Sequence, residues 1–310
     1  MNQTAIRTEN LTRDFETVRA VDGLSLEVPA GIIFGFLGPN GSGKTTTIRL
    51  LLGLLEPTAG RAEVLNWDTR TQADEVRLRS GALLEHNGLY ERLSAEANLE
   101  FYGRVWRLPP ADRRARIQEL LTHLSLWERR KEVVKNWSRG MKQKLAVARA
   151  LLHHPALLFF DEPTAGLDPV AAAALRDDLG RLAVREGVTV FLTTHNLAEA
   201  EKLCNQVGVI RQGKLLAVGH PDELRSRRGA PQAEIVGRGF DDHLLAALRA
   251  RPDVAAAEVR NGRLMIDLRG EVDVAPLVSL IVSAGAQIEE VRKGKASLEE
   301  VFLTLMEEEK

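Results

Sequence analysis

The chain has 310 residues, of which 44% are hydrophobic, and a formal net charge of −1. The length suits one large or two ordinary domains, and the balanced charge excludes an overall field that would favour nucleic acid or an anionic membrane. No apolar run reaches the roughly 18 residues that a membrane-spanning helix needs. A single cysteine, Cys204, excludes an internal disulfide and a cysteine metal cluster. Residues 1–4 lack a charged and apolar signal region, so we expect a soluble protein of a reducing compartment.

Two segments near the N-terminus alternate between apolar and polar residues, which predicts β-strands at residues 5–11 and 24–28. Phe15 lies between them in a polar stretch. An aromatic residue in such a place is either an anchor for a loop or a surface on which a nucleotide base stacks. The residue by itself favours the anchor.

Residues 38–45, with the sequence GPNGSGKT, fill every position of the pattern G-x-x-x-x-G-K-[ST]. An apolar strand is predicted before them and a helix after them, which is the setting that a phosphate-binding loop requires. The glycines let successive N–H groups point at one anion, and the positive end of the helix dipole faces the same point. We expect Lys44 to contact the β- and γ-phosphates and the Thr45 hydroxyl to bind Mg²⁺. A glycine-rich turn between two core elements is the structural alternative. The predicted nucleotide-binding residues of this segment are Gly38, Pro39, Asn40, Gly41, Ser42, Gly43, Lys44, Thr45 and Thr46.

The next part of the chain is predicted to form strands at residues 61–65 and within residues 78–84, the second leading into Glu85. Ser94 is a suitable N-cap for a helical region that lasts to about residue 150. Six basic residues in this region are interpreted as a solvated helical face. They are Arg113, Arg114, Arg116, Arg129, Arg130 and Lys131.

A break at residues 136–144 precedes a strong helix, and Ser138 is its natural N-cap, with Gly140 close behind. A helix that opens on Ser-x-Gly presents free N–H groups and can hold an anion. Without further evidence, this segment is only a capped helix.

Two later strands are predicted to end in side chains that can take part in phosphate chemistry. Residues 156–160 form a continuous apolar run that ends in Asp161 and Glu162, and residues 188–194 form a similar run that ends in His195. Ligands of open α/β sheets collect at such carboxyl ends. Asp161 suits a contact to Mg²⁺, and Glu162 could activate the attacking water as a general base. The alternative for Glu162 is a loop acid that caps the next helix, and the alternative for His195 is a satisfied core residue.

The remainder of the chain is predicted to contain a hairpin, a linker and a small α+β domain. The predicted segments are a hairpin at 207–210 and 214–218, a linker at 225–231, strands at 233–236, 264–268 and 287–291, and helices at 244–249, 274–283 and 298–303. A turn at residues 261–262 forms the centre of a second hairpin. The predicted domains are residues 1–228 and 229–310, and the second is interpreted as a docking or regulatory module.

Together these motifs resemble the ATP-binding cassette family, the ATPase subunits of ABC transporters. Residues 38–45 resemble its Walker A loop, residues 137–143 its signature loop and residues 159–164 its Walker B strand. Asp168 lies in a segment that resembles the D-loop, and His195 resembles the switch histidine. The resemblance covers residues 4 to about 225. It implies an α/β P-loop NTPase fold with a mixed sheet, an antiparallel β-subdomain and a helical subdomain at about residues 90–150.

The resemblance also assigns roles that the residues alone leave open. It places Phe15 on the adenine ring with Val21 beside it. It places a signature loop, made of Ser138, Arg139, Gly140 and Met141, against the γ-phosphate bound by a second copy of the chain. ATP and Mg²⁺ then hold a homodimer together. Glu85 stands where the family has a glutamine that touches Mg²⁺ and the permease. The chain differs from the family at three further positions. Arg139 stands where the family has a glycine, Met141 where it has a glutamine, and Asn196 where an acid is common.

Residues 296–302 resemble the tail of ATPases that serve multidrug, antibiotic, lipid or polysaccharide exporters with a separate permease chain. The leading hypothesis is therefore an exporter ATPase at the cytoplasmic face of the cell membrane, held there by an integral-membrane permease and not bound to nucleic acid. A rival hypothesis is a soluble cassette ATPase of translation or DNA repair. Such proteins usually carry two fused cassettes, whereas this chain has one phosphate loop. A kinase or a nucleotide-dependent switch is disfavoured by the signature loop.

Overall fold

The computed structural model describes residues 3–228, 232–260, 262–270, 272–294, 298–299 and 301–302. The chain divides into two compact units, Met1–Gly219 and His220–Lys310. Helix α8 (Pro221–Arg228) stands at the start of the second unit, whereas the predicted domain boundary lies at the end of this helix. The prediction of a linker is wrong for residues 225–228, because α8 continues through them. Residues 229–231 lie outside the described part of the chain.

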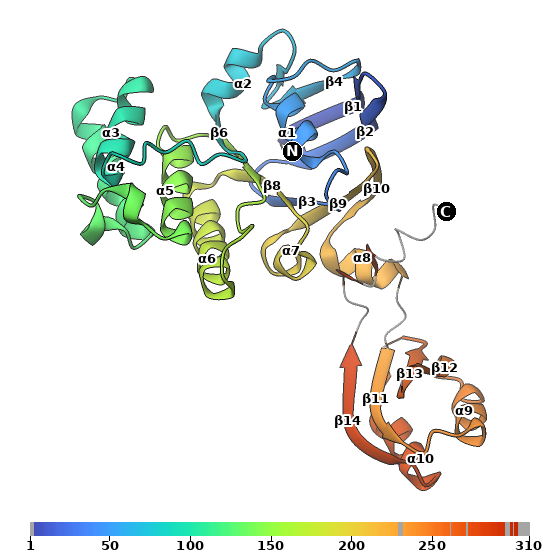
Figure 1. Cartoon of the computed structure of the whole chain (residues 1–310). Coiled ribbons are helices and arrows are strands. Elements are labelled where there is room, and N and C mark those ends of the chain that lie inside the picture. Colours follow the sequence, from blue (N-terminus) through green and yellow to red (C-terminus); the bar gives the residue numbers. More distant parts are fainter. Residues whose placement is uncertain are drawn as a thin grey trace. The chain divides into compact units, whose positions relative to one another are not determined.

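The first unit contains an antiparallel sheet with the strand order β2-β1-β4-β5 (Figure 1). Its strands are β1 (Thr4–Phe15), β2 (Val18–Pro29), β4 (Ala59–Val64) and β5 (Trp67–Asp68). The predicted alternation is confirmed in β2, where Leu24, Leu26 and Val28 are buried. Both N-terminal strands are longer than predicted, so Phe15 is the last residue of β1 rather than part of a loop.

A six-stranded mixed sheet with the order β10-β9-β3-β8-β7-β6 lies at the centre of the same unit. Its strands are β3 (Ile33–Leu37), β6 (Ser80–Leu83), β7 (Leu157–Asp161), β8 (Thr189–Thr194), β9 (Gln206–Arg211) and β10 (Lys214–Gly219). All pairs are parallel except β9 with β10. Strands β3, β7 and β8 are buried along their whole length, as expected for central parallel strands. Their carboxyl ends meet at one edge, so the glycine-rich loop, Asp161, Glu162 and His195 come together there.

In residues 3–219, the part of the first unit that the structure describes, seven α-helices accompany these sheets. They are α1 (Lys44–Leu51), α2 (Ala73–Arg79), α3 (Ala95–Val105), α4 (Pro110–His123), α5 (Arg139–Leu151), α6 (Pro169–Glu186) and α7 (Leu197–Leu203), and short 3₁₀ turns lie at Trp127–Arg129 and Val134–Asn136. Helices α3, α4 and α5 lie on the opposite side of this unit from the antiparallel sheet (Figure 1). The predicted helical region is thus confirmed. Ser94 caps α3 as predicted, because its hydroxyl accepts a hydrogen bond from the Ala97 N–H at 3.1 Å.

The interpretation of the basic residues of this region as a solvated face is wrong for Arg113 and Arg116, whose side chains are both buried. Arg116 lies 2.7 Å from the Glu186 carboxylate of α6, and Arg113 lies 2.8 Å from Glu100 of α3. Buried charges need partners. These partners come from other helices, so the sequence of α4 alone could not reveal them.

After α8, residues 232–294 of the second unit have the element order β-α-β-β-α-β and form a four-stranded antiparallel sheet of order β12-β13-β11-β14. This is the ferredoxin-like arrangement. Its elements are β11 (Gln232–Arg238), α9 (Asp242–Arg249), β12 (Val254–Arg260), β13 (Arg263–Leu268), α10 (Ala275–Ser283) and β14 (Gln287–Gly294). The predicted α+β pattern is confirmed here. Of the predicted final helix, residues 298–299 and 301–302 are helical, and residues 300 and 303 lie outside the described part.

Candidate active site

The predicted phosphate-binding loop runs from the end of β3 to the start of α1 and depends on its glycines. Gly41 and Gly43 have φ angles of 78° and 104°, which favour glycine. A Cβ atom on Gly43 would lie 2.3 Å from the Ala20 carbonyl oxygen, so no other residue fits there. The loop that leads into α1 therefore requires glycine at these positions, as the sequence motif predicts.

Lys44 is the first residue of α1, and its side chain folds back over the loop. Its ammonium group donates hydrogen bonds to the carbonyl oxygens of Gly38, at 2.8 Å, and Pro39, at 3.1 Å. The same nitrogen lies 3.2 Å from Oε1 of Glu162. The Lys44 side chain is only 5% exposed, so these contacts hold a positive charge at the loop.

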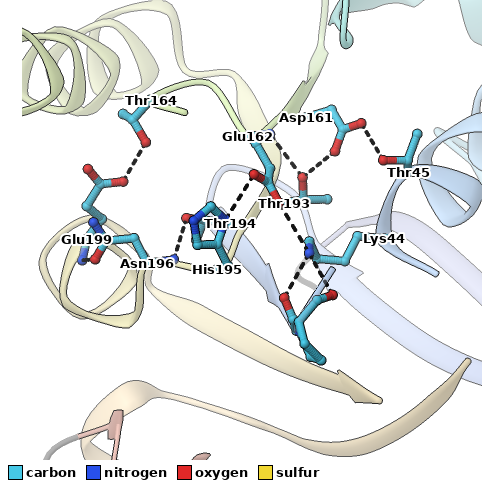
Figure 2. A network of polar contacts seen from close by, with 12 residues as sticks. Lys44, Thr45, Asp161, Glu162, Thr164, Thr193, Thr194, His195, Asn196 and Glu199 are labelled. Atoms are coloured by element: carbon cyan, nitrogen blue, oxygen red, sulfur yellow. Dashed lines mark hydrogen bonds and ion pairs between the residues drawn. The ribbon is translucent and has the colours of Figure 1, made fainter. Parts of the chain in front are cut away.

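Asp161 ends strand β7, and each of its carboxylate oxygens accepts a hydrogen bond from a threonine hydroxyl. Thr45 donates to Oδ2 at 2.6 Å, and Thr193 donates to Oδ1 at 2.5 Å (Figure 2). Thr45 and Asp161 thus place two oxygen donors side by side. Oxygen donors of this kind fit Mg²⁺.

Glu162 follows Asp161 with a φ angle of 49°, a conformation that residues with a Cβ atom rarely adopt. Its backbone N–H donates to the carbonyl and hydroxyl oxygens of Thr193, and its carboxylate lies between two basic side chains. Oε1 faces Lys44, and Oε2 is 2.9 Å from Nδ1 of His195 (Figure 2). The helix-cap alternative for Glu162 is wrong, because the side chain that caps the next helix, α6, is Asp168.

His195 directly follows β8, and its side chain is 56% exposed. The alternative of a satisfied core histidine is therefore wrong. The next residue, Asn196, is the N-cap of α7, and its side chain accepts a hydrogen bond from the Glu199 N–H at 3.2 Å. Asparagine caps a helix as well as aspartate does, so the departure from an acid at this position costs little.

The signature segment begins α5. Ser138 is exposed and caps the helix through a 3.3 Å hydrogen bond from the Met141 N–H. The Arg139 guanidinium packs against Gly166, so closely that a Cβ atom on Gly166 would lie 2.2 Å from it. Gln143 ties the helix to the loop after Glu162 by donating to the Pro163 carbonyl oxygen at 2.7 Å.

An open cavity of about 600 Å³ connects these parts of the first unit. Its lining includes Asn40, Thr45, Glu85, Arg139, Asp161 and Glu162. The phosphate loop, the two acids, the Glu85 position and the start of α5 therefore face one space. Glu85 also forms an ion pair with Arg49 at 3.2 Å, and both side chains are exposed.

The two residues predicted to hold adenine differ in exposure. Phe15 is 39% exposed, and the Arg13 guanidinium lies 4.6 Å from its ring centroid. Val21 is fully buried in the core of the unit. Phe15 thus offers a surface for stacking, whereas the place of Val21 beside a base stays a prediction.

Thr193 was not among the predicted site residues, and Gln143 was predicted only as part of the signature segment, yet both contact the segment around Glu162. The sequence did contain an indication that Thr193 has a role at the site, because Thr193 and Thr194 are polar residues at the end of an otherwise apolar strand. The contact itself depends on the pairing of Thr193 with Asp161 in the parallel register of β8 and β7. That register cannot be derived from one sequence.

Comparison with known proteins identifies the class to which this fold and site belong. Residues 21–165 match the family described as ABC transporter. The chain is 38% identical over 308 residues to a daunorubicin resistance ATP-binding protein, DrrA3, of Streptomyces coeruleorubidus, covering 98% of this chain and 96% of that protein. It is 41% identical to the bacitracin transport ATP-binding protein BcrA of Bacillus licheniformis, over 72% of each chain. A solved structure titled as the ATP binding subunit of an ABC transporter superposes with a TM-score of 0.65 at 29% identity, covering 72% of this chain and 93% of that one.

The chain therefore belongs to the ATP-binding subunits of ABC transporters, and it is an ATPase. Across the described residues, no helix is both long and apolar enough to span a bilayer.

Proposed function

We propose that this chain powers export, and that two copies of it close around two Mg·ATP molecules to drive a separate permease in the membrane. Relatives of similar length are named for resistance to daunorubicin and linearmycin and for export of Nod factor. For ATP-binding subunits of transporters, both resistance and export are consistent with outward transport of a small molecule. Their names support an exporter over a cassette ATPase of translation or DNA repair. The permease would hold the chain at the cytoplasmic face of the membrane.

The observation that carries the proposal is the position of the Glu162 carboxylate between Lys44 and His195, one residue from Asp161. In this arrangement Lys44 binds the β- and γ-phosphates and Glu162 takes the proton of the attacking water. His195 donates to the γ-phosphate. Thr45 and Asp161, with Glu85 from across the cavity, would hold Mg²⁺, which neutralises charge on the phosphates.

The second copy of the chain would complete each site with its signature loop. Ser138 and Arg139 lie exposed, and Gly140 and Met141 half-buried, at the N-terminus of α5, where the first backbone N–H groups have no carbonyl partner within the helix. Such a terminus binds anions well. An arrangement with twofold symmetry lets each copy offer this terminus to the nucleotide of the other. Phe15 would stack on the adenine ring.

The substitution Glu162→Gln tests the site and the dimer together. It keeps the shape of the side chain but removes the base, so we expect ATP binding to persist while hydrolysis falls by roughly 10²–10⁴-fold. With hydrolysis blocked, ATP should trap a dimer that light scattering detects. The matched control is Glu201→Gln in α7, which we expect to hydrolyse ATP at the wild-type rate. Wild-type hydrolysis in Glu162→Gln, or a monomer at saturating ATP, would contradict the proposal.

Copurification tests the transport role. When the tagged chain is purified from a membrane extract of the cells that naturally produce it, a polytopic membrane protein should copurify with it. Recovery on ribosomes or DNA in place of such a protein would favour the rival hypothesis.

A further inference from the structure

The side chain of Thr193 lies between the two acidic residues of the site. Thr193 is the next-to-last residue of β8, and no part of it is exposed. Its hydroxyl oxygen is 2.5 Å from Oδ1 of Asp161 and 3.0 Å from the backbone nitrogen of Glu162 (Figure 2). A single buried hydroxyl therefore contacts both Asp161 and Glu162.

The direction of each hydrogen bond follows from the groups involved. A hydroxyl has one hydrogen to donate and two lone pairs. The Glu162 N–H can only donate, so the Thr193 oxygen must accept from it. The hydroxyl hydrogen is then free for Oδ1 of Asp161, whose other oxygen already accepts from Thr45. The hydroxyl thus links the orientation of the Asp161 carboxylate to the position of the Glu162 backbone.

Glu162 needs such support because of its left-handed backbone, with φ at 49°. Unusual backbone conformations persist only where the surroundings enforce them, and they gather at active sites. Two hydrogen bonds from the Glu162 N–H, to the carbonyl oxygen of Thr193 at 3.1 Å and to its hydroxyl at 3.0 Å, enforce this one. They direct the Glu162 side chain toward Lys44 and His195.

We propose that Thr193 is a positioning residue for ATP hydrolysis. Its hydroxyl holds the Asp161 carboxylate in the orientation that serves Mg²⁺ and fixes the backbone from which Glu162 reaches the attacking water. This inference rests on the proposed roles of Asp161 and Glu162. A threonine that merely fills space in a β-strand would be replaced by valine without effect on either role.

The substitution Thr193→Val tests the hydroxyl at nearly constant volume. Residues that orient metal ligands typically contribute 10–100-fold to metal affinity or activity. We expect kcat to fall by about that factor and the Mg²⁺ concentration for half-maximal activity to rise. ATP affinity measured by calorimetry with EDTA, where Asp161 has no metal to hold, should stay at the wild-type value. Thr193→Ser restores the hydroxyl and should regain most of the lost rate.

Thr189→Val is the matched control on the same strand. Thr189 is also buried, and its hydroxyl accepts a hydrogen bond from the Gly31 N–H at 2.9 Å, at the far end of β8 from the site. This variant loses a comparable hydrogen bond, so it measures the structural cost alone. We expect wild-type kcat and Mg²⁺ dependence from it.

The outcomes separate this inference from the proposed function. Wild-type kcat and Mg²⁺ dependence in Thr193→Val, alongside an inactive Glu162→Gln, would overturn the role of Thr193 alone. An equal loss in Thr189→Val, or no rescue by serine, would also overturn it. An active Glu162→Gln would instead contradict the proposed function. If Thr193→Val does not fold, Thr193→Ala lacks the same hydroxyl, adds no volume and carries the same expectations.

Discussion

The two units of the chain bury different kinds of side chains. Among the described residues, every buried polar or charged side chain lies in the first unit, between Thr8 and Thr194. The buried side chains of the second unit, such as Leu244, Ile266 and Leu277, are apolar. Its charged side chains form pairs near the surface, for example Arg251 with Asp253.

This difference indicates where the chemistry lies. A buried polar group is costly unless another group satisfies it, and a reactive centre needs such groups in a shielded place. The first unit supplies partners from several elements: Thr45 from α1, Asp161 from β7 and Thr193 from β8. The described part of the second unit has an apolar core without a comparable cluster. We therefore expect the second unit to act through its surface and the first through its interior.

The largest structural effect is expected from Arg116→Ala in the first unit. The substitution leaves Glu186, which is 12% exposed, without its main partner at 2.7 Å. Breaking a buried ion pair in this way costs about 3–5 kcal/mol. Urea unfolding should show this loss in the transition of the first unit. The exposed pair of Arg104 with Glu100 gives the control, since Arg104→Ala should cost no more than about 1 kcal/mol. Equal costs for the two variants would contradict the burial argument.

A core substitution in the second unit should leave the first unit intact. Leu277 of α10 is fully buried, so Leu277→Ala should destabilise the second unit by about 2–5 kcal/mol. If the units fold independently, the ATPase rate of the isolated chain should not change. The exposed Val282 on the same helix provides the control, because Val282→Ala should change stability by no more than about 0.5 kcal/mol. Loss of hydrolysis in Leu277→Ala alone would show that the units depend on each other.

A smaller effect should appear on acidification of the first unit. The His153 ring stacks on Trp106 with centroids 3.8 Å apart, and burial lowers the pKa of His153 from 6.5 to about 4. The unfolded chain then takes up this proton near pH 6.5, whereas the folded chain does so only near pH 4. The neutral, buried His153 therefore makes its full contribution to the free energy of unfolding above pH 6.5. This contribution is lost as the pH falls toward 4, and the loss is at most about 3 kcal/mol.

The variant His153→Gln isolates this effect. A glutamine amide can still donate to the Ser80 carbonyl oxygen that the His153 ring contacts at 3.1 Å, but it takes up no proton in this range. Urea unfolding between pH 7 and 4 should therefore give a flatter dependence than in the wild type. The exposed His123 serves as the control, since His123→Gln should keep the wild-type slope. An unchanged slope in His153→Gln would refute the assignment.

Much of the fold follows from local sequence patterns. The apolar runs before Gly38, Asp161 and His195 predicted three buried strands, and the structure confirms all three as neighbours in one sheet. The alternation of buried and exposed residues in β2 and the N-cap at Ser94 were also predicted from the sequence alone. The continuation of α8 to Arg228 was not, because its Arg- and Ser-rich sequence has the composition of a linker.

By itself the sequence predicted the glycine-rich loop, the acids and histidine at the strand ends, and a small α+β part near the end of the chain. Each of these depends on residues close together in the chain, where spacing fixes the backbone. Only the tertiary structure decided that Glu162 lies between Lys44 and His195, that Thr193 contacts both acids, and that Arg116 is buried beside Glu186. Those contacts join distant segments, and they depend on strand order, register and helix packing, which no local pattern encodes.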